Sequence, residues 1–373
     1  MKLLSIVGAR PQFIKLAPFI RSIKEYNREN KNSIEHITVH TGQHYDTGMS
    51  EIFFKELEIP HAEVNLGIGS DLHGKQTGKM IIELEKKIIE LQPDFVIIYG
   101  DTNSTLAGAI AASKLNFKLA HIESGLRSFN KKMPEEINRI VADHVSDVLY
   151  APTQTAVNNL SLEGLMGRTK LSGDIMFDAI LFNKEIAEEK SVILKTYNLI
   201  PKNYAVITLH RAENTDNISI LENILATLNE IASNGLKILF PVHPRTAKLI
   251  KTKINHFKPN ENIILIEPVG YLDMIFLVDN SLLALTDSGG LQKEAFFLNV
   301  PCITLRYETE WLETVQANAN IICGFSREKI LNAIENIISE KTNISKNSSN
   351  YFGDGHAAEF ILNDLLNIHT SKN

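Results

Sequence analysis

The stretch that decides the fold is Val96–Arg139, VIIYGDTNSTLAGAIAASKLNFKLAHIESGLRSFNKKMPEEINR. Two apolar runs in it each end in an acidic residue, Asp101 and Glu123, and the acidic pair Glu135–Glu136 opens the helix predicted after them. Apolar runs that alternate with helical patterns predict parallel strands joined by helices. Because open parallel sheets carry their chemistry at the carboxyl ends of the strands, three carboxylates delivered to this edge predict a site.

The same alternation runs along the chain and restarts once. Strands are predicted at 3–7, 34–40, 95–99, 118–122 and 148–151, and again at 205–209, 237–242, 263–267, 282–286 and 302–305. The charged segment 178–202 lacks a strand pattern, so we predict a hinge there. The expected architecture is α/β, with two Rossmann-type, doubly wound domains and a cleft between them. We place them at 1–178 and 179–354, with a C-terminal helix at about 355–373 packing back on the first domain.

Composition excludes several classes of protein. The 373 residues are 44% hydrophobic and 22% charged, which is ordinary for a globular protein. A net charge of −6, with no Lys/Arg cluster longer than a pair, argues against nucleic-acid binding. No stretch has the roughly 18 apolar residues of a membrane span, and the N-terminus does not resemble a signal peptide. Cys302 and Cys323 form no CxxC motif and are expected to be reduced core residues. We therefore expect a cytoplasmic protein without nucleic-acid or membrane partners.

Two glycine-containing turns suit a phosphate. Ser288-Gly289-Gly290 follows a predicted strand and opens a helix, where backbone N–H groups and the helix dipole favour an anion. A simple helix cap by Asp287 or Ser288 is the alternative. Gly8-Ala9-Arg10-Pro11 repeats the arrangement in the first domain, with Lys15 nearby. Because no GK[ST] motif occurs and the GxG at 67–69 lacks its third glycine, ATP and dinucleotides are disfavoured.

Histidines at two predicted strand ends suit a diphosphate. His210 and His243 each stand beside an arginine, and imidazole can donate or transfer a proton. A structural hydrogen bond is the alternative for either one. His121-Ile122-Glu123 and Cys302 partly match a zinc-deaminase signature, but Leu305 stands where the second cysteine belongs. We therefore predict no metal site.

The acidic residues have structural alternatives of unequal strength. Asp101 could cap the next helix, and Glu135 and Glu136 could simply favour a helix start. Glu123 ends an apolar strand before Ser124-Gly125, where it has no such role. Taken together, the acids predict acid/base chemistry at a carbon atom of a nucleotide-linked substrate.

Nine motifs occur in order over nearly the whole chain: VGARPQFIKLAP, TGQH, YGDTNSTLAGAIAA, HIESGLRS, MPEEINR, LHRAEN, PVHP, EPVGYLD and LTDSGGLQKEA. In these the chain resembles the non-hydrolysing UDP-N-acetylglucosamine 2-epimerase family, whose fold is GT-B-like. The resemblance implies inversion at C2 of a UDP-2-acetamido sugar, without a metal or nicotinamide cofactor. It implies anti elimination of UDP to a 2-acetamidoglucal, then re-addition of UDP and of a proton on the opposite face. A homodimer and a role in polysaccharide biosynthesis are also implied.

Site residues carry over from the matching motifs. The catalytic ones are Asp101, Glu123, Glu135 and His210. The substrate-binding ones are Arg10, Lys15, Arg139, His243, Met274, Ser288, Gly289, Gly290 and Glu294, the last on the uridine ribose. Which acid removes the C2 proton stays open.

The chain also departs from the family pattern. Trp311 follows Thr309-Glu310 where the family has an arginine, and Met274 stands where many members have an aromatic residue near uracil. Tyr45-Asp46 and Lys75-Gln76 replace the residues associated with allosteric UDP-N-acetylglucosamine binding, so allosteric activation is not expected.

Several functional alternatives stay open. The motifs YETEW and SFNKKMPEEINR are similar to the branch that acts on UDP-2,3-diacetamido-2,3-dideoxyglucuronate. This uronate and UDP-N-acetylglucosamine are equally favoured as substrates. Two further readings are a hydrolysing epimerase that releases N-acetylmannosamine and UDP, and a catalytically silent UDP-sugar sensor.

Overall fold

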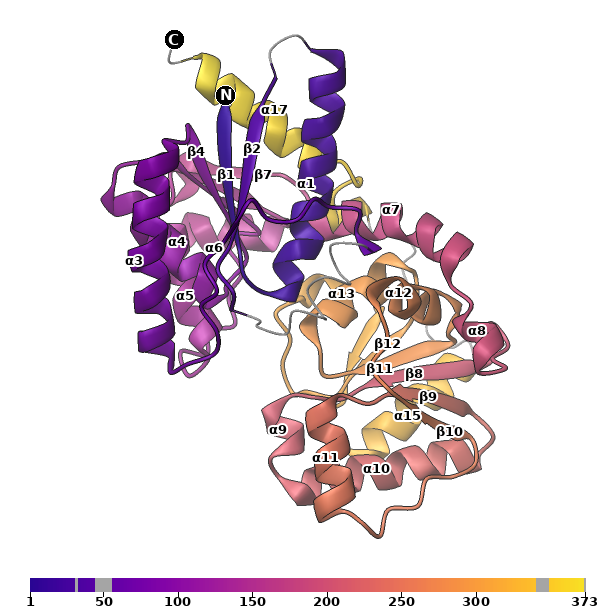
Figure 1. Ribbon diagram of the computed structural model, residues 1–373. Helices are drawn as coiled ribbons and strands as arrows, with labels where there is room; N and C mark the ends of the chain where they lie inside the picture. The colour runs from indigo at the N-terminus through magenta and orange to yellow at the C-terminus, as the bar shows by residue number, and fades with distance from the viewer. Residues whose placement is uncertain (31–32, 44–55, 340–348, 372–373) are drawn as a thin grey trace. The chain divides into compact units, whose positions relative to one another are not determined.

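Two wholly parallel sheets form the framework of the protein in the computed structural model (Figure 1). The structure describes residues 1–30, 33–43, 56–339 and 349–371. The chain divides into a first unit, Met1–Leu181 with Ser349–Asn373, and a second unit, Phe182–Ser348. The units thus divide after residues 181 and 348, whereas the sequence predicts boundaries after residues 178 and 354.

The first unit holds a seven-stranded sheet in the order β3-β2-β1-β4-β5-β6-β7. Its strands are β1 (Lys2–Val7), β2 (Glu35–His40), β3 (Val64–Asn65), β4 (Phe95–Tyr99), β5 (Leu119–Ile122), β6 (Val148–Ala151) and β7 (Thr169–Leu171). Its helices are α1 (Arg10–Glu29), α3 (His73–Leu91), α4 (Asn103–Lys114), α5 (Pro134–Val145), α6 (Gln154–Leu162), the 3-10 turn η1 (Met166–Arg168), α16 (Ser349–Phe352) and α17 (Ala357–Thr370). Helix α7 (Ile175–Lys190) continues into the second unit.

The second unit holds a six-stranded sheet in the order β10-β9-β8-β11-β12-β13. Its strands are β8 (Tyr204–Thr208), β9 (Lys237–Pro241), β10 (Ile263–Ile266), β11 (Leu283–Thr286), β12 (Cys302–Thr304) and β13 (Asn320–Ile322). Its helices are α8 (Ile193–Thr196), α9 (Ala212–Thr215), α10 (Ile218–Ser233), α11 (Pro244–Lys253), α12 (Tyr271–Asn280), α13 (Gly289–Phe297), α14 (Leu312–Gln316) and α15 (Arg327–Ile338). Two all-parallel sheets with flanking helices confirm the predicted fold class, while the cleft stays a prediction.

Each sheet changes winding direction once, and this decides where polar groups collect. In the first unit the change falls between β1 and β4, and in the second between β8 and β11. Parallel pairing across these points aligns Ile6 with Ile98 and Thr208 with Thr286. Loops that leave the carboxyl ends of such strands diverge to opposite faces of the sheet, so a ligand fits between them.

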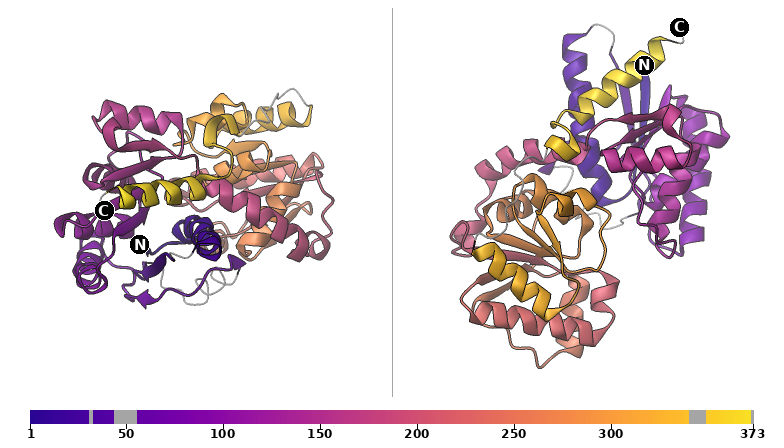
Figure 2. Two further views of the ribbon diagram at one scale, coloured as in Figure 1. Left: turned by 90° about the horizontal axis from the view of Figure 1, so that it is seen from above. Right: turned by 180° about the vertical axis from the view of Figure 1, so that it is seen from behind.

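Helices cover both faces of each sheet. In the first unit α3, α4 and α5 lie side by side, while α17 packs along α1 (Figure 2). The carboxylate of Asp178 accepts the N–H groups of Ala357 and Ala358 at the start of α17, at 3.2 and 2.7 Å. In the second unit α10 packs beside α15, and α13 contacts α12 and α14.

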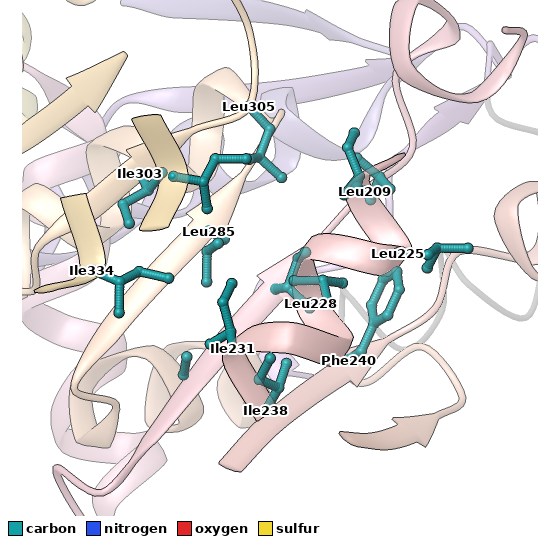
Figure 3. Close-up of a cluster of buried hydrophobic side chains, with 14 of the residues drawn as sticks. Leu209, Leu225, Leu228, Ile231, Ile238, Phe240, Leu285, Ile303, Leu305 and Ile334 are labelled. Atoms are coloured by element: carbon teal, nitrogen blue, oxygen red, sulfur yellow. The ribbon is translucent and has the colours of Figure 1, made fainter. Parts of the chain in front are cut away.

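The cores are aliphatic layers between sheet and helices. The helical spacing of Met80, Leu84, Ile88 and Leu91 predicts a core-facing stripe on α3, and the first three are fully buried while Leu91 is partly buried. Figure 3 shows the corresponding layer of the second unit, where Leu225 and Leu228 of α10 pack over Phe240 and Leu285 of the sheet. Burial raises the pKa of Cys302 to about 12 and that of Cys323 to about 11, so both thiols stay protonated at neutral pH. Among the described residues, no helix is long and apolar enough to cross a membrane.

Three strands have no counterpart in the predicted pattern: β3, β7 and β13, each of two or three residues. Such short segments show no alternation of polar and apolar residues, and pairing with a longer neighbour defines them. The segment 178–202, where we predict a hinge, contains most of α7 and all of α8, and the division between the two units falls within it. Charged residues such as those of KEIAEEK are good helix formers, so their lack of a strand pattern is not a lack of structure.

A buried histidine makes the stability of the first unit depend on pH. The ring of His36 on β2 lies 2.9 Å from the Ser5 hydroxyl and beside Phe19, and burial lowers its pKa to about 4. The folded state therefore binds fewer protons than the unfolded state, where the pKa is 6.5. The stabilising contribution is complete above the unfolded pKa and is lost as pH falls from 6.5 towards 4. We expect this loss to be on the order of 3 kcal/mol.

Urea unfolding of wild type and His36→Gln, at about pH 7 and about pH 4.5, measures this loss. The difference between the two proteins should change with pH in the stated direction. His256→Gln, at a side chain 69% exposed, serves as the control and should follow wild type. Equal pH dependence of wild type and His36→Gln would contradict a neutral buried His36.

Candidate active site

Asp101 follows β4 beside the point where the first sheet changes direction. It does not cap α4, because Thr102 is the cap residue and its side chain accepts the N–H of Thr105. Asp101 Oδ2 instead accepts a hydrogen bond from Arg139 NH2 at 2.6 Å. The side-chain amide of Asn138 donates to the Asp101 carbonyl at 2.9 Å. The helix-cap alternative for Asp101 is therefore wrong, and its carboxylate belongs to a charged cluster.

Several charges act on the Asp101 carboxylate, whose side chain is 33% exposed. Burial raises its pKa, and the neighbouring acids Glu123 and Glu135 raise it further, against lowering by Arg139 and Lys15. The net direction is upward. The three predicted carboxylates thus lie close enough to influence one another, and Asp101 is suited to carry a proton.

Glu123 follows β5 in an unusual backbone conformation. Its φ of +66° lies in the left-handed region, which costs a residue with a side chain roughly 1–2 kcal/mol. The side chain is 7% exposed, and its Oε2 atom forms an ion pair with Lys15 Nζ, which is also buried. Strain of this kind in a buried charged residue is typical of functional sites.

The backbone at Gly100 leaves room for this ion pair. A Cβ atom at Gly100 would lie 2.9 Å from Lys15 Nζ and 3.1 Å from Glu123 Oε2. The residue also has φ +62°. Its N–H donates to Ile122 O at 3.0 Å, which ties the ends of β4 and β5 together.

Gly100→Ala should therefore displace the Lys15–Glu123 pair and lower activity by about 10-fold or more. Gly67→Ala is the matched control, because Gly67 has the same φ of +62° but no atom within 4 Å of its added Cβ. Both substitutions carry the same backbone cost of about 1 kcal/mol, so thermal unfolding should respond to both. An equal effect of the two on activity would exclude a role for the contacts around Gly100.

The two glutamates at the start of α5 have different surroundings. Glu136 is buried, and its carboxylate accepts the N–H groups of Ser128 and Phe129 at 2.9 and 2.8 Å, so it holds the preceding loop. Glu135 is partly exposed and acts on Asp101 through its charge. The NH1 atom of the buried Arg139 forms an ion pair with Glu136 Oε2 at 3.4 Å, so Arg139 links Glu136 to Asp101.

The start of α1 differs from the predicted phosphate turn. The side-chain oxygen of Gln12 accepts the N–H groups of Gly8 and Ala9 at 2.8 and 3.1 Å, so these amides serve the fold. Arg10 is the first residue of the helix, and Lys15, one turn further, belongs to the carboxylate cluster.

His210 and His243 meet at the ends of β8 and β9, with ring centroids 5.7 Å apart. The His210 Nδ1 atom lies 3.2 Å from Asp287 Oδ1, and its side chain is 37% exposed. The Nδ1 atom of His243 accepts the N–H of Arg245 at 3.3 Å and so caps α11. Burial lowers the pKa of His243, and the charges of His210 and Arg245 lower it further.

The start of α13 is open to an anion. Ser288 is its cap residue, but among the described residues no side chain accepts a capping hydrogen bond there. None of Ser288, Gly289 and Gly290 has a positive φ. Added Cβ atoms at Gly289 and Gly290 would make only ordinary contacts, at 3.6 Å or more. Packing within the unit therefore does not require the glycines, whereas a close-binding phosphate would.

Two other predicted binding residues lie on helices of this unit. Glu294 is 8% exposed, on α13, and Met274 is partly exposed in the first turn of α12.

Trp311 lies beside the start of α13 with a cation against it. The Nζ atom of the buried Lys293 is 3.8 Å from the centroid of the indole ring. The Trp311 Nε1 atom would lie 3.6 Å from a Cβ at Gly289. The buried Arg306 forms an ion pair with Glu310 at 3.2 Å. A cation, Lys293, therefore lies beside Trp311, while the charge of Arg306 is balanced by Glu310.

Some residues of the site were not identified from the sequence. Asp287 was considered only as a helix cap, yet its buried carboxylate accepts the N–H groups of His210 and Arg211 at 3.0 and 2.9 Å. Asn138 is a second example. Asn138 is 37 residues from its partner Asp101 in the sequence, and Asp287 is 77 residues from His210. The only signal for them in the sequence was their location near a strand end or a helix start.

Two other sequence predictions concern metal and effector binding. No cluster of three or more potential metal ligands occurs among the residues that the structure describes. Lys75 forms an ion pair with Asp71 at 2.9 Å, and Gln76 accepts a hydrogen bond from Asn103 at 2.8 Å. Tyr45 and Asp46 lie outside the described residues.

Two all-parallel α/β units with polar strand ends at each change of winding define a protein of the GT-B-like class. The family model described as UDP-N-acetylglucosamine 2-epimerase matches residues 26–366, and the chain belongs to this family. A UDP-N-acetylglucosamine 2-epimerase homolog of Methanococcus maripaludis is 50% identical over 99% of this chain and 100% of its own. The UDP-2,3-diacetamido-2,3-dideoxy-D-glucuronate 2-epimerase of Pseudomonas aeruginosa is 44% identical, with coverage of 99% and 100%.

A solved structure agrees over the same extent. The Methanocaldococcus jannaschii UDP-GlcNAc 2-epimerase, crystallised in complex with UDP-GlcNAc and UDP, is 46% identical and has a TM-score of 0.87. The match covers 98% of this chain and 99% of that one. The family resemblance inferred from the motifs is thereby confirmed.

Proposed function

We propose that the protein is a non-hydrolysing epimerase that inverts C2 of a UDP-linked 2-acetamido sugar. The observation that carries the proposal is the cluster of Asp101, Glu123 and Glu135 with Lys15 and Arg139 in a member of this family. Inversion requires a proton to leave one face of C2 and another to arrive on the opposite face. Carboxylates with different surroundings are suited to these two transfers.

The reaction balances as an elimination followed by an addition. A base takes the C2 proton while the C1–O bond breaks, and its electron pair leaves with UDP. The resulting 2-acetamidoglucal then takes back UDP at C1 and a proton at C2 from the other face. No oxidant, reductant or water is consumed. The C2–H bond is weakly acidic, so the departure of UDP must be stabilised strongly.

The strand ends of the second unit supply groups for the leaving UDP. His210 and His243 can donate to phosphate oxygens, and the start of α13 offers N–H groups and the positive end of a helix dipole. Lys293 beside Trp311 adds a charge near the same helix start. We assign Glu294 to the ribose and Met274 to the uracil on the family motifs. We assign Arg10 to the diphosphate.

The substrate is either UDP-N-acetylglucosamine or the diacetamido-uronate. Relatives that carry each name match at similar identity, 46% and 44%. The two candidates differ at C3 and C6 and share the reacting C1–C2 segment, so the proposed chemistry holds for both. A homodimer is proposed on the family resemblance alone.

Incubation with each UDP-sugar in deuterated water tests the proposal. We expect deuterium at C2 of both epimers, with UDP-sugar as the only product. Stoichiometric release of UDP and free N-acetylmannosamine would identify a hydrolysing enzyme instead. Tight binding of both UDP-sugars without exchange at C2 would identify a sensor. The substrate that exchanges faster at equal concentration is the preferred one.

A further inference from the structure

A buried histidine that the proposed reaction does not use lies on β5. His121 is completely buried, and hydrogen-bonding groups contact both its ring nitrogens. Nε2 lies 2.7 Å from the carbonyl oxygen of Gly100, and Nδ1 lies 2.8 Å from Asp143 Oδ1 on α5. Because a carbonyl oxygen only accepts, Nε2 must carry a proton.

The state of Nδ1 follows from the surroundings of Asp143. Its second oxygen, Oδ2, lies 2.7 Å from Arg127 NH1 and accepts the N–H of Gly125 at 3.1 Å. Arg127 is anchored in turn by two 2.7 Å hydrogen bonds to Glu163. The guanidinium of Arg127 and the N–H of Gly125 both donate to Oδ2, which favours the ionised form of Asp143 without any contribution from His121. An ionised Asp143 requires a donor at Nδ1.

We propose that His121 is a positioning residue, a buried imidazolium that holds the two loops carrying Asp101 and Glu123. Its Nε2–H group fixes the carbonyl of Gly100, the residue before Asp101. Through Asp143 it fixes the N–H of Gly125, two residues after Glu123. Both of these links end on backbone atoms, so the action of His121 on the two loops is exerted through the backbone. This inference rests on the proposed function for its kinetic consequence only.

The position of Gly100 explains why such an anchor matters. A shift of this residue changes the space beside Lys15 Nζ and Glu123 Oε2, which lie about 3 Å from its Cβ position. The same shift moves Asp101 relative to Arg139. The groups that face the imidazole are Asp143 from α5 and the carbonyl of the β4–α4 loop, with Arg127 and Glu163 behind Asp143. The four side chains balance in charge, which makes the network tolerable in a buried place.

Nitrogen NMR of the protein with ring-labelled histidine tests the protonation state without any substrate. At about pH 7.5, His121 should show two protonated ring nitrogens. His36 is the internal control, because it is also buried but its pKa is lowered to about 4, so it should show a single neutral tautomer. The His121 signals are assigned by transfer from its backbone resonances. A neutral tautomer at His121 would overturn the proposal.

Kinetics of Asp143→Asn and His121→Gln test the positioning role. Each variant should lower the rate of C2 exchange by about 10²-fold. Binding of UDP, most of whose assigned groups lie in the second unit, should stay within about 2-fold of wild type. The control is His144→Gln, the exposed neighbour of Asp143 on α5, which should keep the wild-type rate. Wild-type exchange rates in both network variants would overturn the positioning role, and a joint loss of exchange and UDP binding would indicate misfolding and also contradict it.

The two proposals fail separately. Absence of C2 exchange in wild type with either UDP-sugar would sink the proposed function and leave the imidazolium to be decided by NMR. A neutral His121 in an active epimerase would sink the further inference alone.

Discussion

Replacement of Glu123 by glutamine should lower C2 exchange by about 10³-fold, since a positioned acid or base contributes roughly 10²–10⁴-fold and an amide can do neither job. The substitution preserves the shape of the side chain and removes only its ability to take or give a proton. Most of the groups assigned to UDP lie in the second unit, and the substitution leaves Arg10 of the first unit in place, so titration calorimetry with UDP should give an unchanged Kd. Loss of exchange with intact UDP binding is the expected result.

Stability must be measured together with activity in this variant. Lys15 is 8% exposed in its side chain and pairs with Glu123, so glutamine leaves a buried ammonium without its counter-charge. Breaking one side of a buried pair typically costs about 3–5 kcal/mol. We therefore expect a lower unfolding midpoint as well. The double variant Lys15→Met with Glu123→Gln removes the uncompensated charge and should recover much of the stability but none of the exchange.

A surface glutamate provides the matched control. Glu230 forms two hydrogen bonds with Arg327, at 2.6 and 2.5 Å, on an exposed part of the second unit. Glu230→Gln removes one carboxylate from an ion pair, as Glu123→Gln does, and should leave exchange unchanged. If Glu123→Gln retained exchange within a few-fold of wild type, Glu123 would not be a proton-transfer residue.

The sequence predicts the sheet framework well, because its main strands are buried on both faces. The run FVIIY is apolar over its whole length and the run LAHI is interrupted only by His121, and the structure places β4 and β5 on them. The helical stripe of α3 is equally plain. Strands such as β7, with the residues TKL, are partly exposed and short, so only their neighbours identify them.

A candidate site residue could be recognised in the sequence where its position offers the side chain no ordinary structural role, such as capping a helix. Glu123 at a strand end was distinguished for this reason, and the structure adds its left-handed backbone and its pairing with Lys15. Partners supplied from distant segments could not be predicted. A helix cap was the structural alternative for Asp101, but Thr102 fulfils that role, and Arg139 from another helix pairs with the Asp101 carboxylate. The order of the strands in the sheet decides which distant residues meet in this way, and the local sequence around Asp101 does not contain that order.

Replacement of Asp287 by asparagine should also impair turnover severely, by about 10²- to 10³-fold. The buried carboxylate accepts the N–H groups of His210 and Arg211 and receives Nδ1 of His210, so it fixes both the backbone and the ring. With Nδ1–H donated to Asp287, Nε2 is the nitrogen available to a substrate. An amide presents an NH2 group to at least one of these donors, and the imidazole loses its fixed tautomer.

The effect should appear in kcat more than in KM, because ring orientation matters most when UDP leaves. Loss of an acceptor for buried N–H groups should also cost about 1–3 kcal/mol of stability. Asp216→Asn is the control, since Asp216 is 58% exposed and pairs with Arg245 beside the same strand ends. Its rate should match wild type at low and high salt alike. A folded Asp287→Asn protein with a wild-type kcat would show that the reaction does not need Asp287 to fix the tautomer of His210. The measurement of kcat therefore decides whether this carboxylate serves the reaction or only the fold.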